Sequence, residues 1–175
     1  MDEVMIDVEK DKMALLKRLL RVAPDIVLRD EETLGNYIKL KPWVMSLDDY
    51  FSPYYDLVEY LDVHTTILAT LENLNDLREL TMGQVLEVMK LEELKRAIGE
   101  FWDEEPAKLT GELSLEDDLG ITGGDFDELM VFLTRELGLT FELETVHYYR
   151  HPEAMFTRSD KKTDLCIRDL LRWMP

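Results

Sequence analysis

The feature that most constrains the fold is helical periodicity in the second half of the chain. Apolar side chains recur every three or four residues over two stretches, which is the spacing that places them on one face of an α-helix. The first stretch must end before Pro106, and Gly138 follows the second as a C-cap. These stretches predict two amphipathic helices joined by a loop over residues 105–120. Their apolar positions are Leu91, Leu94, Ala97, Ile98, Phe101 and Trp102, and then Phe126, Leu129, Met130, Leu133 and Leu137.

The first half shows less regular helical patterns. Residues 10–21 carry five basic side chains against one acid, with leucines at helical spacing, and predict a basic amphipathic helix. A capping-box pattern at residues 46–49 predicts a helix start, and Pro53 predicts that this helix is bent or restarted there. The Leu-rich residues 63–89 predict two further helices, split near residues 73–76.

The predicted fold class is therefore mainly α. Residues 1–88 are expected to form an N-terminal helical domain or cap, and residues 89–175 a second domain. Residues 25–44 fit either short strands or irregular segments. Residues 80–86 resemble residues 165–171 in pattern, so a degenerate repeat in the first half is an open alternative.

Charge and cysteine usage limit the expected partners and compartment. The net charge is −18, which argues against nucleic acid and favours a basic partner, since phosphate backbones are bound by clustered Lys and Arg. Cys166 is the only cysteine, so no intrachain disulfide is expected. The first residues are charged where a signal peptide needs an apolar run, and no apolar stretch of about 18 residues occurs. A cytoplasmic protein without membrane contact is predicted.

The stretch DLGITGGDFDEL, residues 118–129, has the pattern of a helix start. Its cap residue is expected to bond the amide three positions on, and apolar residues on either side form a hydrophobic staple. Gly123 and Gly124 then occupy the first two helical positions, where they leave backbone N–H groups open to an approaching partner. The predicted cap and staple residues are Thr122, Asp125, Ile121 and Phe126.

Together with the helical layout, this motif resembles that of acyl carrier proteins. The spacing from residues 98–100 to the DLG turn at residues 118–120 is similar without a gap, and residues 163–174 resemble the final helix of that family. In carrier proteins a serine at the position of Gly123 bears the phosphopantetheine arm. A bacterial family of carrier-like domains of unknown function, with Gly in place of that serine, is more similar still. The resemblance covers about residues 89–175 and implies a carrier-like four-helix bundle without a prosthetic group.

An acid-rich stretch surrounds the motif. Between Gly99 and Glu128 there are eleven acidic residues and one basic residue. Such a run is usually a solvated face, whereas the resemblance implies a docking surface, because carrier proteins present an acidic second helix to basic enzymes. A third alternative is that the basic residues 10–21 fold back onto it. The predicted partner-binding residues are Glu116, Asp117, Asp118, Gly123, Gly124, Asp125, Asp127 and Glu128.

The predicted function is that of a non-catalytic interaction protein that binds a basic partner, such as a fatty-acid or polyketide enzyme, through residues 116–128. One alternative is an unusual acyl carrier modified at Thr122 or Ser114. Another is an immunity or inhibitor protein of a basic toxin or nuclease. The sequence contains no P-loop, G-x-G-x-x-G or catalytic-triad order, so no enzyme activity and no cofactor are expected.

No metal site is predicted either. The acids of residues 116–127 lack the spacing of a calcium loop. His147 and His151 lack a convincing third ligand. Cys166 is expected to be a small buried residue on the last helix.

Overall fold

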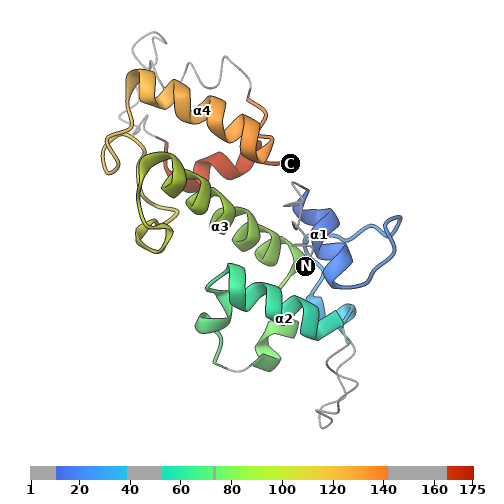
Figure 1. Ribbon diagram of the computed structural model, residues 1–175. Coiled ribbons are helices and arrows are strands. Elements are labelled where there is room, and N and C mark those ends of the chain that lie inside the picture. The colour runs from blue at the N-terminus through green and yellow to red at the C-terminus, as the bar shows by residue number, and fades with distance from the viewer. Residues whose placement is uncertain (1–10, 39–52, 73, 142–164) are drawn as a thin grey trace, which may run out of the picture. The chain divides into compact units, whose positions relative to one another are not determined.

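The computed structural model describes residues 11–38, 53–72, 74–141 and 165–175. These residues are mainly helical, as predicted (Figure 1). The chain divides into two units, Met1–Lys90 and Leu91–Pro175, each with its own hydrophobic core. In the described part of the chain, no helix combines the length and apolarity that crossing a membrane requires.

The first unit begins with the basic helix α1, Lys12–Leu19, which lies within the predicted residues 10–21. Its N-cap is Asp11, whose carboxylate accepts hydrogen bonds from the N–H groups of Met13 at 2.9 Å and Ala14 at 3.1 Å. The remaining elements of this unit are the 3₁₀ helix η1 (Leu34–Asn36), helix α2 (Pro53–His64), the 3₁₀ helices η3 (Ile67–Thr70) and η4 (Leu74–Glu79), and the start of α3 (Met82–Trp102).

Two helix predictions in the first half are wrong. The first helix expected within residues 63–89 is absent, because α2 ends at His64 and 3₁₀ helices follow it. The second is not a separate helix, because α3 continues without a break through Leu91 to Trp102. No Gly or Pro stands between Val85 and Leu94 to interrupt it, and a helix propagates easily once started.

Other expectations in the first half have mixed outcomes. The helix start predicted at residues 46–49 lies outside the described residues, but α2 does begin at Pro53, where a restart was expected. Between residues 25 and 38 the chain forms turns, the short helix η1 and one isolated antiparallel bridge from Thr33 to Thr81. This matches the irregular alternative for that segment more closely than strands.

The second unit contains the end of α3, the 3₁₀ helix η5 (Pro106–Lys108), helix α4 (Gly123–Leu137) and the 3₁₀ helix η7 (Ile167–Trp173). Gly138 is the C-cap of α4, as predicted, with a left-handed φ of +69° and its N–H bonded to the carbonyl of Thr134 at 3.0 Å. The last helix, η7, lies within residues 163–174, where a final helix was expected, and has the 3₁₀ form.

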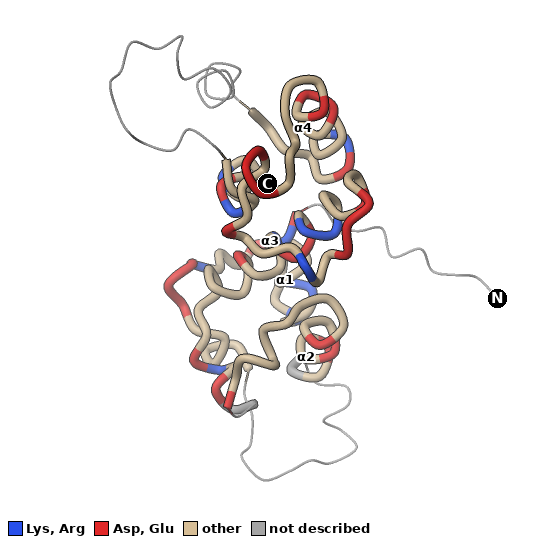
Figure 2. The backbone as a smooth tube through the Cα atoms, turned by 90° about the vertical axis from the view of Figure 1, so that its left-hand side faces the viewer, with Lys and Arg blue, Asp and Glu red and all other residues tan. Residues whose placement is uncertain are grey.

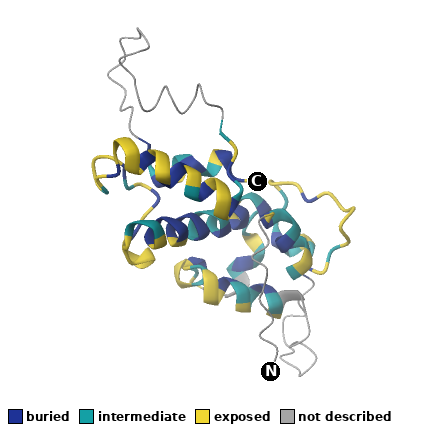
Figure 3. Ribbon diagram, turned by 45° about the horizontal axis from the view of Figure 1, so that its top comes forward, coloured by how far each residue is buried: buried dark blue, intermediate teal, exposed yellow. Residues whose placement is uncertain are grey.

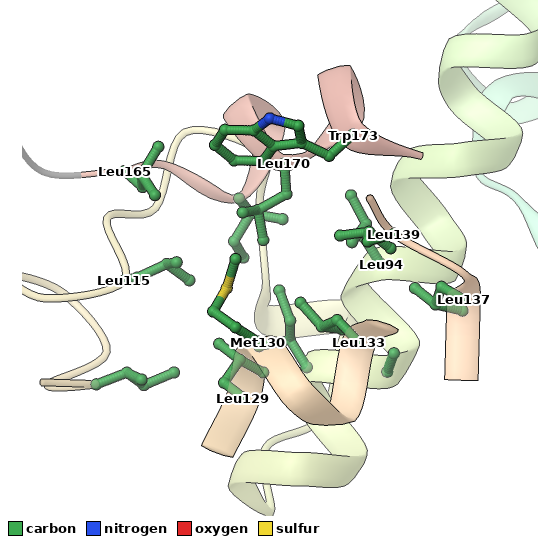
Figure 4. Close-up of a cluster of buried hydrophobic side chains, with 14 of the residues drawn as sticks. Leu94, Leu115, Leu129, Met130, Leu133, Leu137, Leu139, Leu165, Leu170 and Trp173 are labelled. Carbon is green, nitrogen blue, oxygen red and sulfur yellow. The ribbon is translucent and has the colours of Figure 1, made fainter. Parts of the chain in front are cut away.

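The core of the second unit forms around one face of α4. All five apolar positions predicted for this helix are buried, and its opposite face is exposed (Figure 3). Met130 and Leu133 of α4 lie among Leu94 of α3 and Leu170 and Trp173 of η7 (Figure 4). Each leucine buried in this way stabilises the unit by roughly 1.5–3 kcal/mol. The packing therefore fixes which side of α4 faces solvent.

Candidate docking surface

The loop before α4 is held by a turn built on Ser114. The Ser114 side chain is buried, and its hydroxyl oxygen accepts a hydrogen bond from the N–H of Asp117 at 2.8 Å. In return, the N–H of Ser114 donates to a carboxylate oxygen of Asp118 at 2.8 Å. An arm attached to Ser114, the alternative for an unusual carrier, would require this turn to open. The sequence signal for this turn is a serine followed by acids three and four residues later, Asp117 and Asp118, and the turn was not predicted from it.

A backbone contact joins this turn to the helix start. The N–H of Ile121 donates to the carbonyl of Leu115 at 2.8 Å, and both side chains are buried in the core of the second unit. Phe126, the other predicted staple residue, is buried in the same core as Ile121, as a hydrophobic staple requires. The loop therefore delivers the chain to the start of α4 in a defined position.

The helix begins at Gly123, as predicted, but the expected capping box is wrong. The Thr122 side chain makes no capping hydrogen bond. Instead, the backbone carbonyl of Thr122 accepts from the N–H groups of Asp125 at 3.1 Å and Phe126 at 3.4 Å. Gly123 has a φ of +54°, in the left-handed region, so the chain enters the helix through a backbone turn that does not use the threonine hydroxyl.

The two glycines differ in what the fold requires of them. A Cβ atom built on Gly123 or Gly124 would meet no atom within 4 Å, so neither glycine is needed for close packing against the described chain. At Gly123 the positive φ favours glycine by itself, since other residues are strained there. Gly124 has no such backbone requirement. Its missing side chain leaves the first turn of α4 accessible to a close-fitting partner.

All the residues predicted to bind a partner are exposed. They lie along the loop and the first turns of α4, where acidic residues gather (Figure 2). The one basic residue in the acid-rich stretch, Lys108, is 3.3 Å from the carboxylate of Glu105. Further along α4, Arg135 contacts Glu136 at 2.7 Å and lies over the ring of Phe132. Because the acids of residues 116–128 are exposed, their negative charge faces solvent.

The remaining candidates from the sequence are a metal site, the two histidines and Cys166. Among the described residues, no group of three His, Cys, Asp or Glu side chains is placed to hold a metal ion. His147 and His151 lie outside the described residues. Cys166 is only partly buried, contrary to the prediction, because it precedes η7 as its N-cap, and its N–H donates to the carboxylate of Asp169 at 2.9 Å.

In comparisons with protein-family models, curated proteins and solved structures, no match to this chain is found. The resemblance to acyl carrier proteins therefore stays an expectation drawn from the motif and its spacing. The surface itself has to be interpreted from its own residues.

Proposed function

We propose that the second unit is a carrier-like scaffold without a prosthetic group, and that it binds a basic protein partner through residues 116–128. One observation carries the proposal: this exposed acidic segment leads into a helix whose first turn bears two glycines with open space around them. The loop that leads into this segment is anchored by buried Ser114 and Leu115 and by the hydrogen bond from the Asp117 N–H to the Ser114 hydroxyl. Preorganisation of this kind lowers the entropic cost of binding.

Charge supports a cationic partner. The acids of residues 116–128 lie within a few residues of one another, so their fields add over a Debye length of about 8 Å at physiological salt. A clustered negative potential steers a basic partner and raises its association rate. The same potential repels phosphate groups, which makes an anionic ligand at the helix start unfavourable.

The proposed role requires a protein-binding surface and no catalytic groups, so the protein acts as an adaptor or competitor and not as an enzyme. A partner from fatty-acid or polyketide synthesis follows if the carrier resemblance reflects ancestry. An immunity or inhibitor role uses the same surface against a small basic toxin. The two roles differ in salt dependence, because a tight inhibitor complex with a large apolar core survives high salt.

The test is affinity capture from the host lysate, followed by titration of the captured partner at low and high salt. The key variant reverses three charges, with Asp125→Lys, Asp127→Lys and Glu128→Lys combined. We expect it to raise the Kd by about tenfold or more at low salt and to flatten the salt dependence, because each lost steering charge weakens association.

A matched variant reverses three exposed acids of the first unit, Glu31→Lys, Glu59→Lys and Asp62→Lys, and so changes the net charge equally. It should change the Kd by less than about threefold. The proposal is wrong if the α4 variant binds with unchanged affinity and unchanged salt dependence. Equal losses in both variants would show that only net charge matters.

A further inference from the structure

The two units share a pattern of backbone hydrogen bonds around one bridge each. Among the described residues, each unit has an isolated antiparallel bridge, Thr33 to Thr81 in the first and Ser114 to Cys166 in the second. In the first unit the bonds run from the N–H of Leu34 to the carbonyl of Leu80 (2.9 Å), from Met82 to Glu32 (2.8 Å) and from Gly83 to Asp30 (3.0 Å). In the second they run from the N–H of Leu115 to the carbonyl of Leu165 (2.8 Å), from Ile167 to Leu113 (3.0 Å) and from Arg168 to Gly111 (2.9 Å). The spacing along both segments is identical in the two units.

The segment before each bridge also matches. Shortly after the end of α1 at Leu19 and of α3 at Trp102, each unit has a non-glycine residue in the left-handed region, Arg21 with φ +53° and Asp103 with φ +56°. Such residues are uncommon, and each is followed by a bond that spans five residues. These bonds run from the N–H of Val22 to the carbonyl of Lys17 and from Glu104 to Gly99, both at 2.9 Å. Two turns follow in the same order in both units, and each is closed by a bond from an N–H group to the carbonyl three residues earlier. In the first unit these bonds run from Ile26 to Ala23 and from Glu32 to Arg29. In the second they run from Lys108 to Glu105 and from Leu113 to Thr110.

The helix after each bridge starts in the same way. The N–H of Thr81 donates to the side chain of Gln84 at 2.9 Å, and the N–H of Gln84 donates back to the Thr81 hydroxyl at 3.2 Å. Cys166 and Asp169 form the corresponding reciprocal pair at the start of η7. Buried residues also correspond, namely Leu16 with Ile98, Leu28 with Leu109, Leu34 with Leu115, Met82 with Ile167 and Val85 with Leu170.

We infer that the two units are two copies of one folding unit, so that the chain is an internal duplication. Short Leu-rich helices match by chance, but a bridge of the same register, a left-handed helix end and a reciprocal cap are independent features. On this assignment α2 is the counterpart of α4. The glycine start of α4 is then a feature of the second copy, since α2 begins with Pro53.

Each unit has a glycine beside its bridge, where the two bridged segments come close together. A Cβ on Gly83 would lie 3.2 Å from the Cβ of Asp30, and a Cβ on Gly111 would lie 3.2 Å from Nε of Arg168. The two segments approach each other closely at this bond in both units, and one side has a glycine in each. The glycine is on opposite sides: Gly83 faces Asp30 in the first unit, and Gly111 faces Arg168 in the second.

The test transfers the arrangement of the second unit into the first, in the full chain. Gly83→Arg alone places a side chain against Asp30, whereas Gly83→Arg with Asp30→Gly recreates the Arg168–Gly111 contact. Glu31 follows Asp30 in the first unit as Glu112 follows Gly111 in the second, where Glu112 is 3.0 Å from Arg168. In a double-mutant cycle measured by urea unfolding, we expect the pair to be coupled by about tenfold or more in the unfolding equilibrium constant.

The matched control combines Gly83→Arg with Asp30→Ala, which removes the same charge but keeps a Cβ at position 30. Relative to Gly83→Arg alone, this control should regain clearly less free energy of unfolding than the variant that combines Gly83→Arg with Asp30→Gly. The reciprocal pair, Gly111→Asp with Arg168→Gly, repeats the cycle in the second unit should the first set fail to fold. The inference is overturned if neither pair is coupled, or if the alanine control recovers as much. This result is independent of the proposed binding surface, which the cycles do not alter.

Discussion

The two units have the same backbone hydrogen bonds around their bridges, but they carry different side chains at equivalent positions. At one equivalent helical position the first unit has the buried Lys12, and the second has the buried Leu94. At an equivalent position outside the helices, next to the bridge, the first unit has the acid Glu32 and the second has Leu113. The difference shows that the register is specified by a few apolar positions and turns, which leaves the other positions free to diverge. The acids and glycines of the α4 start belong to this divergent set.

The largest expected effect comes from the paired core leucines, Leu34 and Leu115, which are fully buried in their units. Replacing either by Ala should cost about 2–5 kcal/mol, because a cavity is left behind. Hydrogen exchange measured for each residue should show the loss mainly in the unit that carries the substitution. Equal loss of protection in both units would mean that the two cores do not behave separately. Val131→Ala, at an exposed position of α4, is the control and should cost little.

The second comparison is between Lys17 of α1 and Gly99 of α3, which lie at equivalent positions near the ends of these helices. A Cβ on Gly99 would lie 2.5 Å from the carbonyl oxygen of Glu104, so Gly99→Ala forces the chain to shift and should cost about 1–3 kcal/mol. Lys17→Ala removes only an exposed bond from Nζ to the carbonyl of Pro24 and should cost less than about 1 kcal/mol. Urea unfolding of both variants distinguishes the sites, and similar losses would contradict the close approach at Gly99.

The third prediction separates the two glycines at the start of α4. Gly123→Ala should destabilise the protein by about 1–2 kcal/mol, because alanine is strained at a left-handed φ. Gly124→Ala should stabilise it by about 0.5–1 kcal/mol, since Ala is the better helix former and open space surrounds the position. Thermal unfolding gives the two signs. If Gly124→Ala raises the Tm and also weakens partner binding, the accessible first turn is part of the binding surface.

The smallest effect is a pH dependence that arises from Glu32 in the first unit. The Glu32 carboxylate accepts bonds from the N–H of Arg29 at 3.0 Å and the Tyr37 hydroxyl at 2.8 Å. The bond from Arg29, and then that from Tyr37, lower the pKa of Glu32 below its ordinary value. A lowered pKa stabilises the fold above the ordinary value, and this contribution is lost as the pH falls through the lowered value.

An NMR titration of the Glu32 side chain tests this pH dependence. In Tyr37→Phe the pKa of Glu32 should move toward its ordinary value while staying below it, because the Arg29 N–H bond remains. Leu113 has no ionisable group at the equivalent position, so the second unit should show no matching transition. A Glu32 pKa that is unchanged by the loss of the Tyr37 hydroxyl would contradict the contact.

The sequence alone determined the features that depend on neighbouring residues. Helical periodicity predicted the buried face of α4, and a glycine in the right place predicted its end at Gly138. It also predicted α1 and the exposed acids before α4, because charge and spacing are local properties of the chain.

Only the tertiary structure decided the features that depend on distant residues. The bridges pair segments far apart in the chain, so the shared register of the two units is hardly visible in the sequence. The start of η7 is likewise tied to a distant segment, because the N–H groups of Ile167 and Arg168 bond to the carbonyls of Leu113 and Gly111 in the loop. At the α4 start, the buried Ile121 and Leu115 fix the path of the loop. The left-handed φ of Gly123 and the missing side-chain cap of Thr122 at this helix start are features that the capping pattern in the sequence did not predict.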